Sequence, residues 1–217
     1  MNLQNIILPL PGIFIGLTIH EYCHALAASK LGDQTAKEMG RLTFNIFKHV
    51  DPIGFFFLIF AGFGWARPVK FNPENLSHPR RDKAIIAAAG PLSNLVLAFI
   101  FIALIKAWQA IPDPATSAQA ALVSFFYSGA FFIFIKIIYF AAVVNLGLFI
   151  FNLIPVPPLD GSRIVFSGLN LSSDTEAKIM KIGAPLLLIL FIIQTRLDIN
   201  IFPIGKLITA IMNLFML

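Results

Sequence analysis

The residues with the clearest chemical meaning are two histidines and a glutamate in the sequence HEYCH, residues 20–24. They lie in an apolar stretch, residues 6–31, where polar groups are costly and therefore indicate a function. On a helix His20 and His24 share a face and can bind one metal ion, with Glu21 beside them within reach of a water molecule on that ion. The pattern predicts zinc-assisted hydrolysis. The alternative is a pair of histidines buried against neighbouring helices.

A catalytic zinc ion usually takes three protein ligands, so the chain must supply one more. The best candidate is Asp160 in the sequence NLIPVPPLDG, residues 152–161. The prolines end a helix here, and Gly161 frees the backbone beside the carboxylate. An unwound segment of this kind can bring Asp160 to a neighbouring helix. The alternative interpretation, which the segment taken alone would favour, is that Asp160 is an acidic residue in a proline-rich turn at a membrane boundary.

Two asparagines are further candidates, because Asn94 and Asn152 fall at the depth expected for the metal. A side-chain amide there could hold the substrate backbone or stabilise the oxyanion formed when water attacks a peptide carbonyl. Hydrogen bonding between helices is the alternative, and for Asn94 it has equal weight. For Asn152 we favour the functional interpretation. His49 and His78 lie in basic loops and are predicted to be solvated.

The composition is typical of a membrane protein that crosses the bilayer several times. Of the 217 residues 58% are hydrophobic and 12% charged, and the mean hydropathy is +0.83. The formal net charge of +5 is explained by loop lysines and arginines that set the orientation in the membrane. No basic face with interleaved aromatic residues is present, so nucleic acid is excluded as a partner. We expect residues 1–217 to form one membrane domain.

The lengths of the apolar segments predict an all-α protein with about five transmembrane helices and one short re-entrant segment. A helix needs about 20 residues to cross the hydrocarbon core, and residues 53–65 are too few. The apolar segments are residues 6–28, 53–65, 84–110, 120–154, 177–194 and 199–217.

Charge counting predicts the topology. The loops at residues 30–48 and 67–83 hold nine Lys and Arg residues, whereas residues 107–119 hold none. If the short segment does not cross, both basic loops lie on the cytoplasmic side, as the positive-inside rule requires. Asp160 then reaches the same side as His20 and His24. If the short segment did cross, Asp160 would emerge about 30 Å away.

A small membrane-associated β element is also predicted. Residues 42–46 alternate apolar and polar, which is strand periodicity, and residues 69–71 could form a partner strand. The element could cover the ends of the helices. Alternatively, its edge could bind an extended substrate as an added strand.

Taken together, these motifs resemble the site-2 protease family of intramembrane zinc metalloproteases. The resemblance rests on HEYCH, on GPLSN at residues 90–94 and on NLIPVPPLDG. Two further motifs resemble sequences of the compact prokaryotic branch, which lacks PDZ and CBS domains: HVDPIG at residues 49–54 and GWARPV at residues 64–69. The resemblance implies that His20, His24 and Asp160 ligate one zinc ion and that Glu21 activates the water. It also implies that Asn94 and Asn152 assist the substrate or the transition state.

The expected function is therefore hydrolysis of peptide bonds within or near transmembrane helices of other proteins. The expected location is a prokaryotic inner membrane, with the active site toward the cytoplasm and with the lipid bilayer and membrane-helix substrates as partners. Two alternatives remain open: a divalent-metal transporter, and a proteolytically inactive scaffold that binds membrane helices.

Overall fold

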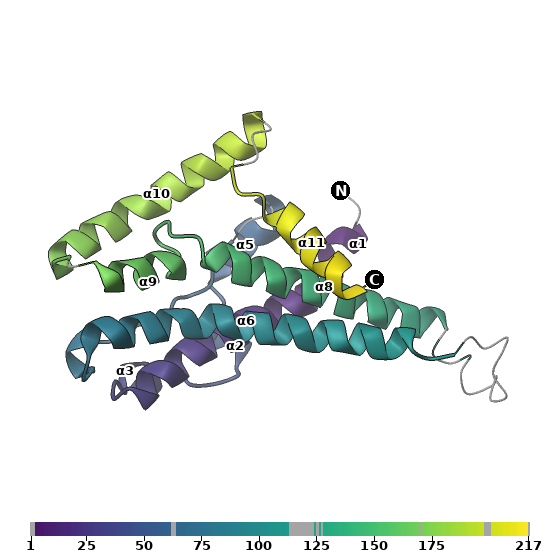
Figure 1. The fold of residues 1–217 in the computed structure, drawn as a ribbon, viewed down its shortest axis with the longest axis horizontal. Coiled ribbons are helices and arrows are strands. Elements are labelled where there is room, and N and C mark those ends of the chain that lie inside the picture. The colour runs from purple at the N-terminus through teal and green to yellow at the C-terminus, as the bar shows by residue number, and fades with distance from the viewer. Residues whose placement is uncertain are drawn as a thin grey trace.

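The structure is a computed structural model that describes residues 3–61, 64–112, 124, 126, 128–169, 171–197 and 201–216. These residues form an elongated bundle of helices (Figure 1). In chain order the elements are α1 (Leu3–Ile7), α2 (Leu10–Lys30), α3 (Thr35–Glu38), α4 (Ile46–His49), α5 (Pro52–Ala61), the 3-10 turn η1 (Pro73–Asn75), α6 (Pro79–Gln109), α8 (Gly129–Asn152), α9 (Asp160–Gly168), α10 (Ser173–Leu197) and α11 (Ile204–Met216).

Helices α2, α6 and α8 form the centre of the bundle. α6 packs against both of the others and runs antiparallel to them, so that α2 ends where α6 begins (Figure 1). Buried apolar side chains, among them Ile105 and Leu146, join α6 to α8. Gly12 allows α2 and α8 to approach closely, because a Cβ atom there would lie 2.5 Å from the Cα of Ala141. Such close packing holds the helices that carry the candidate site at fixed positions.

The described helices include two candidate membrane spans. α6 and the Phe131–Asn152 part of α8 are long and apolar enough to cross a bilayer. α5 has ten residues, which extend about 15 Å at 1.5 Å per residue and cannot cross a hydrocarbon core of about 30 Å. The predicted 120–154 segment begins outside the described residues, and its long helix, α8, starts at Gly129. The all-α prediction is thus confirmed for the described residues, while five crossings remain a prediction.

The predicted β element is not formed within the described residues. Residues 42–45 form a bend and an irregular stretch that lead into α4, which begins at Ile46, and the one pairing among the described residues is an isolated antiparallel bridge between Val50 and Ala66. The reason is local: the Asn45 side chain accepts the Phe47 N–H at 3.1 Å and caps α4. Side-chain capping by asparagine competes with strand pairing, and here it outweighs the alternation of apolar residues.

A buried carboxylate fastens the loop before α6 to the end of α2. Asp33 is fully buried and accepts hydrogen bonds from Thr35, from the Asn72 N–H and from the Asn75 side chain. Burial by itself would raise the pKa of Asp33, but these hydrogen bonds outweigh it and lower the pKa below its ordinary value. The ionised carboxylate therefore holds the loop against α2, close to the candidate site.

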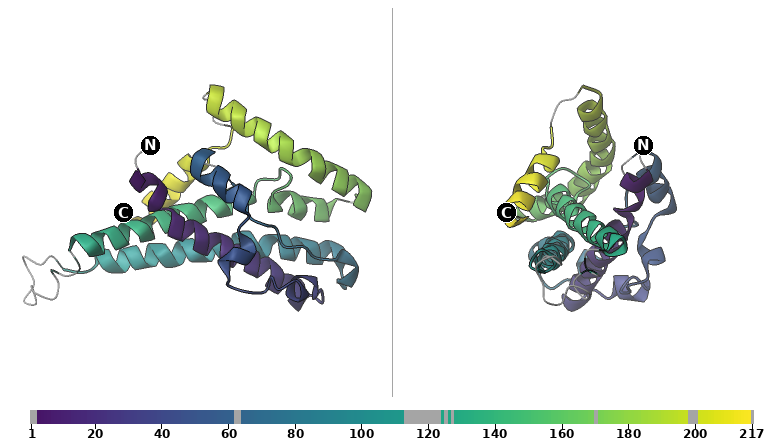
Figure 2. Two further views of the ribbon diagram at one scale, coloured as in Figure 1. Left: turned by 180° about the vertical axis from the view of Figure 1, so that it is seen from behind. Right: turned by 90° about the vertical axis from the view of Figure 1, so that its right-hand side faces the viewer.

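The C-terminal helices pack on the central bundle in different places. α9 packs against α6 and α11 against α8, and the end-on view of Figure 2 shows α8 between α2, α6 and α11. α10 slants away from α8 and is tied to the start of α6 by an ion pair between Lys83 and Glu176, with Nζ and Oε2 2.6 Å apart. α9 lies against α6, where it can deliver its first residue, Asp160, to the bundle.

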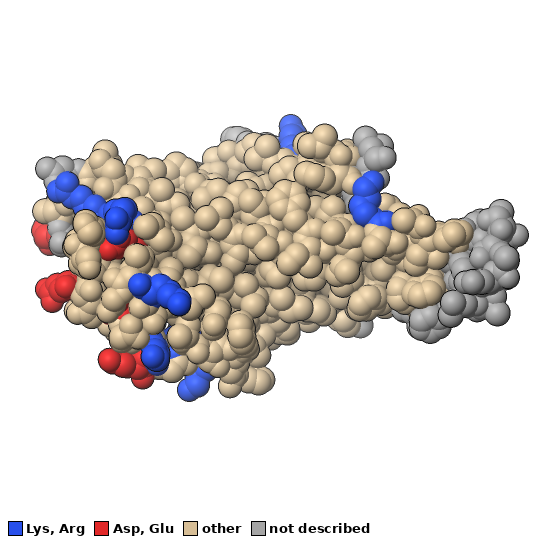
Figure 3. Space-filling view, turned by 60° about the horizontal axis from the view of Figure 1, so that its bottom comes forward, with Lys and Arg blue, Asp and Glu red and all other residues tan. Residues whose placement is uncertain are grey.

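Charged side chains gather at one end of the molecule. On the face drawn in Figure 3 the acidic side chains lie at the end that holds α3 and the start of α6, together with most of the basic ones. The long middle of this face carries few charges. The distribution agrees with a polar end in water and an apolar body in lipid.

Candidate metal centre

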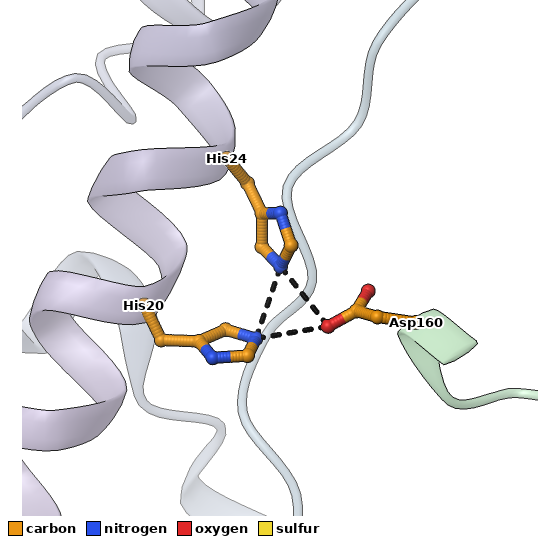
Figure 4. A group of neighbouring side chains, drawn as sticks. All are labelled: His20, His24 and Asp160. Atoms are coloured by element: carbon orange, nitrogen blue, oxygen red, sulfur yellow. Dashed lines mark hydrogen bonds and ion pairs between the residues drawn. The ribbon is translucent and has the colours of Figure 1, made fainter. Parts of the chain in front are cut away.

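Three potential metal ligands from two distant segments meet beside α6. His20 and His24 lie one turn apart on α2, and Asp160 is the first residue of α9. The two Nε2 atoms are 3.0 Å apart, and Asp160 Oδ2 lies 3.1 Å from Nε2 of His20 and 3.3 Å from Nε2 of His24 (Figure 4). The structure therefore brings together the two imidazoles and the carboxylate that the sequence analysis selected.

The second nitrogen of each imidazole has a hydrogen-bond partner that fixes the tautomer. His24 Nδ1–H donates to the Ile86 carbonyl at 2.7 Å. His20 Nδ1 lies 2.6 Å from Asn94 Oδ1, whose amide NH₂ donates elsewhere, so this nitrogen also carries the proton. Both Nε2 atoms then present lone pairs, which is the form that binds metals.

This geometry meets the requirements of a zinc ion. Zinc binds nitrogen and oxygen at about 2.0–2.1 Å in tetrahedral geometry, which separates neighbouring ligand atoms by roughly 3.4 Å. The observed separations of 3.0, 3.1 and 3.3 Å agree with this value. Two lone pairs and a carboxylate oxygen directed at one another repel unless a metal ion or a shared proton lies between them. The three residues thus fit a zinc site that leaves a fourth position for water.

The proline-rich turn between α8 and α9 delivers the carboxylate. α8 ends at Asn152, and the turn is closed by backbone hydrogen bonds from Val156 N–H to Ile154 O and from Leu159 N–H to Val156 O. Gly161 is required here because a Cβ atom would lie 2.3 Å from the Leu153 carbonyl oxygen. The close approach folds the start of α9 back against the end of α8.

Gly90 forms the wall of the site on the α6 side, a role that the sequence analysis missed. A Cβ atom at this position would lie 2.4 Å from Nε2 of His24 and 2.6 Å from Nε2 of His20. The available signal was its spacing: Gly90 is one turn before Asn94, on the same face of α6. The missing side chain leaves room for an ion and its ligands.

Gly90→Ala is expected to lower zinc affinity by about 10- to 100-fold, since the added methyl group enters the ligand triangle and overpacking costs about 1–3 kcal/mol. Zinc titration of the purified metal-free protein measures the change. Gly147→Ala is the matched control, because its Cβ atom would meet Ile208 at an ordinary 3.5 Å. Equal zinc affinity for Gly90→Ala and the wild type would show that Gly90 does not border the ion.

Asn94 lies behind His20 and connects the three central helices. It is fully buried, and its amide NH₂ donates to Gly16 O on α2 at 3.1 Å and to Asn145 Oδ1 on α8 at 2.9 Å. Asn145 in turn donates to Ala141 O and Gly12 O. These contacts agree with the interpretation of Asn94 as a residue that forms hydrogen bonds between helices. Its hydrogen bond to His20 additionally orients the His20 ring.

Asn94→Leu is expected to lower zinc affinity by about 10- to 100-fold, the usual effect of losing the partner of a metal-binding histidine. The His20 ring would no longer be held in one tautomer and orientation. Zinc titration again provides the measurement, and Asn213→Leu on α11 serves as the control. Unchanged affinity would assign Asn94 to helix packing alone.

The remaining candidates fall outside the ligand triangle. Asn152 is partly buried and donates to Leu148 O of its own helix at 2.9 Å. Glu21 is 7% exposed, and its Oε2 accepts the Val69 N–H at 3.0 Å. His78 is exposed as predicted. The prediction for His49 was wrong: it is fully buried and Nε2 bonds to Thr43 O at 2.7 Å, because the loop folds over it.

Comparison with known proteins agrees with this geometry. Residues 10–191 match the family described as Peptidase family M50. The chain belongs to peptidase family M50. M50 proteins are membrane-embedded, and the two candidate spans α6 and α8 agree with that setting. No solved structure matches the chain significantly.

Two M50 relatives carry names that refer to zinc. The chain is 42% identical over 153 residues to "Putative zinc metalloprotease YwhC" of Bacillus subtilis (strain 168), a match that covers 70% of this chain and 65% of that protein. It is 32% identical over 160 residues to "Putative zinc metalloprotease Rip2" of Mycolicibacterium smegmatis, covering 71% and 54%. The chain thus spans less than two thirds of either relative.

Proposed function

We propose that this chain is an intramembrane zinc metalloprotease of the site-2 type that hydrolyses peptide bonds within or near transmembrane helices of substrate proteins. The observation that carries the proposal is the triangle of His20, His24 and Asp160, with Glu21 next to it on α2 and two long apolar helices around it. Membership of peptidase family M50 and the zinc metalloprotease names of its relatives support it.

Each site residue has a proposed role. His20, His24 and Asp160 hold the zinc ion, and Asn94 keeps His20 in the metal-binding tautomer. When bound, zinc supplies Lewis-acid chemistry, which polarises a peptide carbonyl and lowers the pKa of water. Glu21 accepts a proton from the attacking water and passes it to the leaving nitrogen. Asn152, at the end of α8, is proposed to hold the substrate backbone or the developing oxyanion.

The proposed setting is a prokaryotic inner membrane, with residues 1–217 as one domain that crosses it about five times. The gathering of charged residues at the end where α2 stops and α6 starts supports a cytoplasmic position for that end and for the nearby site. A polar path from that end must admit water. Since a helix hides its carbonyls, the substrate must unwind locally before it is cut, and helix-breaking residues in it should promote cleavage.

Metal removal tests the proposal directly. The purified protein in lipid vesicles, with a single-span membrane protein as substrate, is expected to lose cleavage upon chelation and to regain it when one equivalent of zinc is added. Cleavage products are followed by mass spectrometry. Cleavage that continues unchanged in the fully metal-depleted protein would refute a zinc-dependent mechanism. Zinc-loaded protein that cleaves no membrane substrate would refute the proposal that this chain is an intramembrane protease.

A further inference from the structure

Arg41 is a buried arginine beside the carboxylate of Glu21. It is 6% exposed, and its Nη2 lies 4.0 Å from Glu21 Oε2. The same oxygen accepts the N–H of Val69 at 3.0 Å. Two donors from different segments therefore approach one oxygen of Glu21. Neither contact uses its other carboxylate oxygen.

The local sequence explains why Arg41 points inward. α3 ends at Glu38, and Gly40, two residues later, has a φ of +66°, in the left-handed region that glycine adopts without strain. Gly40 N–H bonds to Lys37 O and Arg41 N–H to Ala36 O, each at 2.9 Å, which closes the helix end. Ala36 packs against Ala25 of α2. Arg41 thus leaves a short helix that is itself fixed against α2.

The hydrogen bonding of Arg41 is incomplete for a buried cation. A guanidinium has five N–H donors, and burying it is costly unless they are paired. Arg41 Nη2 donates to the Arg67 carbonyl, whereas Nε has no partner among the described residues. A buried, incompletely paired arginine calls for an explanation, and a role at the neighbouring site supplies one. The anion within reach is Glu21.

We propose that Arg41 is a positioning residue for Glu21. Together with the Val69 N–H it fixes Oε2 and so leaves the other carboxylate oxygen to face the reacting water. This inference rests on the proposed protease function, in which Glu21 moves the proton. A base displaced by about 1 Å loses on the order of 100-fold in rate, so the placement of Glu21 has a large effect on turnover.

Kinetics of Arg41→Met and Arg41→Lys test the inference in lipid vesicles. Arg41→Met is expected to lower kcat by about 10- to 100-fold. Its KM should stay within about twofold of the wild-type value, and its zinc content should be unchanged. Arg41→Lys is expected to recover part of the lost kcat because it keeps the positive charge. Lys37→Met, which changes an exposed lysine on α3 just before Arg41, is the control. Wild-type kcat in Arg41→Met, or loss of zinc from both Arg41 variants, would overturn the inference.

A binding measurement separates this inference from the protease proposal. A hydroxamate binds zinc and shares its hydroxyl proton with a neighbouring carboxylate, so its affinity reports where Glu21 lies. Arg41→Met is expected to weaken hydroxamate binding about 10-fold in the wild type and to have no effect in Glu21→Gln. Equal effects in both backgrounds would overturn the inference. This double-mutant cycle remains informative even if no membrane substrate is cleaved.

Discussion

Glu21→Gln is expected to stop proteolysis while zinc remains bound. The amide keeps the size of the side chain but cannot accept and return a proton, and loss of a general base costs about 10²- to 10⁴-fold in rate. The metal ligands are unaffected, since the triangle consists of His20, His24 and Asp160. Cleavage of a single-span substrate in lipid vesicles and zinc content by mass spectrometry should be measured on the same preparation.

Glu38→Gln is the matched control, because Glu38 is exposed at the end of α3. This experiment also separates the alternative functions. A divalent-metal transporter would keep most of its zinc flux after Glu21→Gln, and an inactive scaffold would hold its membrane partners as before and never cut them. Cleavage by Glu21→Gln at the wild-type rate would exclude Glu21 as the base.

Asp160→Ala is expected to release the zinc ion and, with it, all cleavage. The substitution removes the one anionic ligand of the three, and the two histidines that remain are too few for a catalytic zinc site, which takes about three protein ligands. Zinc content should fall from about one ion per chain to near zero. Metal analysis after dialysis against a weak chelator gives the measurement, with cleavage as the second readout.

Asp174→Ala provides the control, because this aspartate lies on α10 in an exposed ion pair with Lys178. Asp160→Asn adds a finer comparison: the amide oxygen can still approach the metal but carries no charge, so zinc should bind more weakly than in the wild type and more tightly than in Asp160→Ala. Full zinc occupancy in Asp160→Ala would mean that another group completes the site.

The motif at residues 20–24 was sufficient to predict the shared face of His20 and His24, because helix periodicity is a local property. Asp160 could also be predicted, since segment length and loop charge place it on the same side as the histidines. Asn94 was selected by its expected depth and by the family resemblance, whereas its bond to His20 required the packing of α2 against α6. The bond to Asn145 likewise depends on the distance between α6 and α8.

Other features depended on how distant segments pack. Residues 42–46 alternate like a strand, yet the Asn45 cap starts α4 instead. His49 has a polar sequence neighbourhood, yet the loop covers it completely. Arg41 looks like one of several loop cations, yet it turns inward to Glu21. In each case the residue type allows two environments, and only the surrounding backbone selects one.

The sequence by itself determined which residue types the proposed chemistry uses, namely histidine and aspartate for the metal and glutamate for the proton, and the apolar composition typical of a membrane protein. Those properties follow from side-chain type, helix period and segment length, which are local. The tertiary structure alone decided how closely Gly90 borders the histidines, which amides orient them and which cation faces Glu21. These depend on separations of a few ångströms between segments far apart in the chain, which no local pattern encodes.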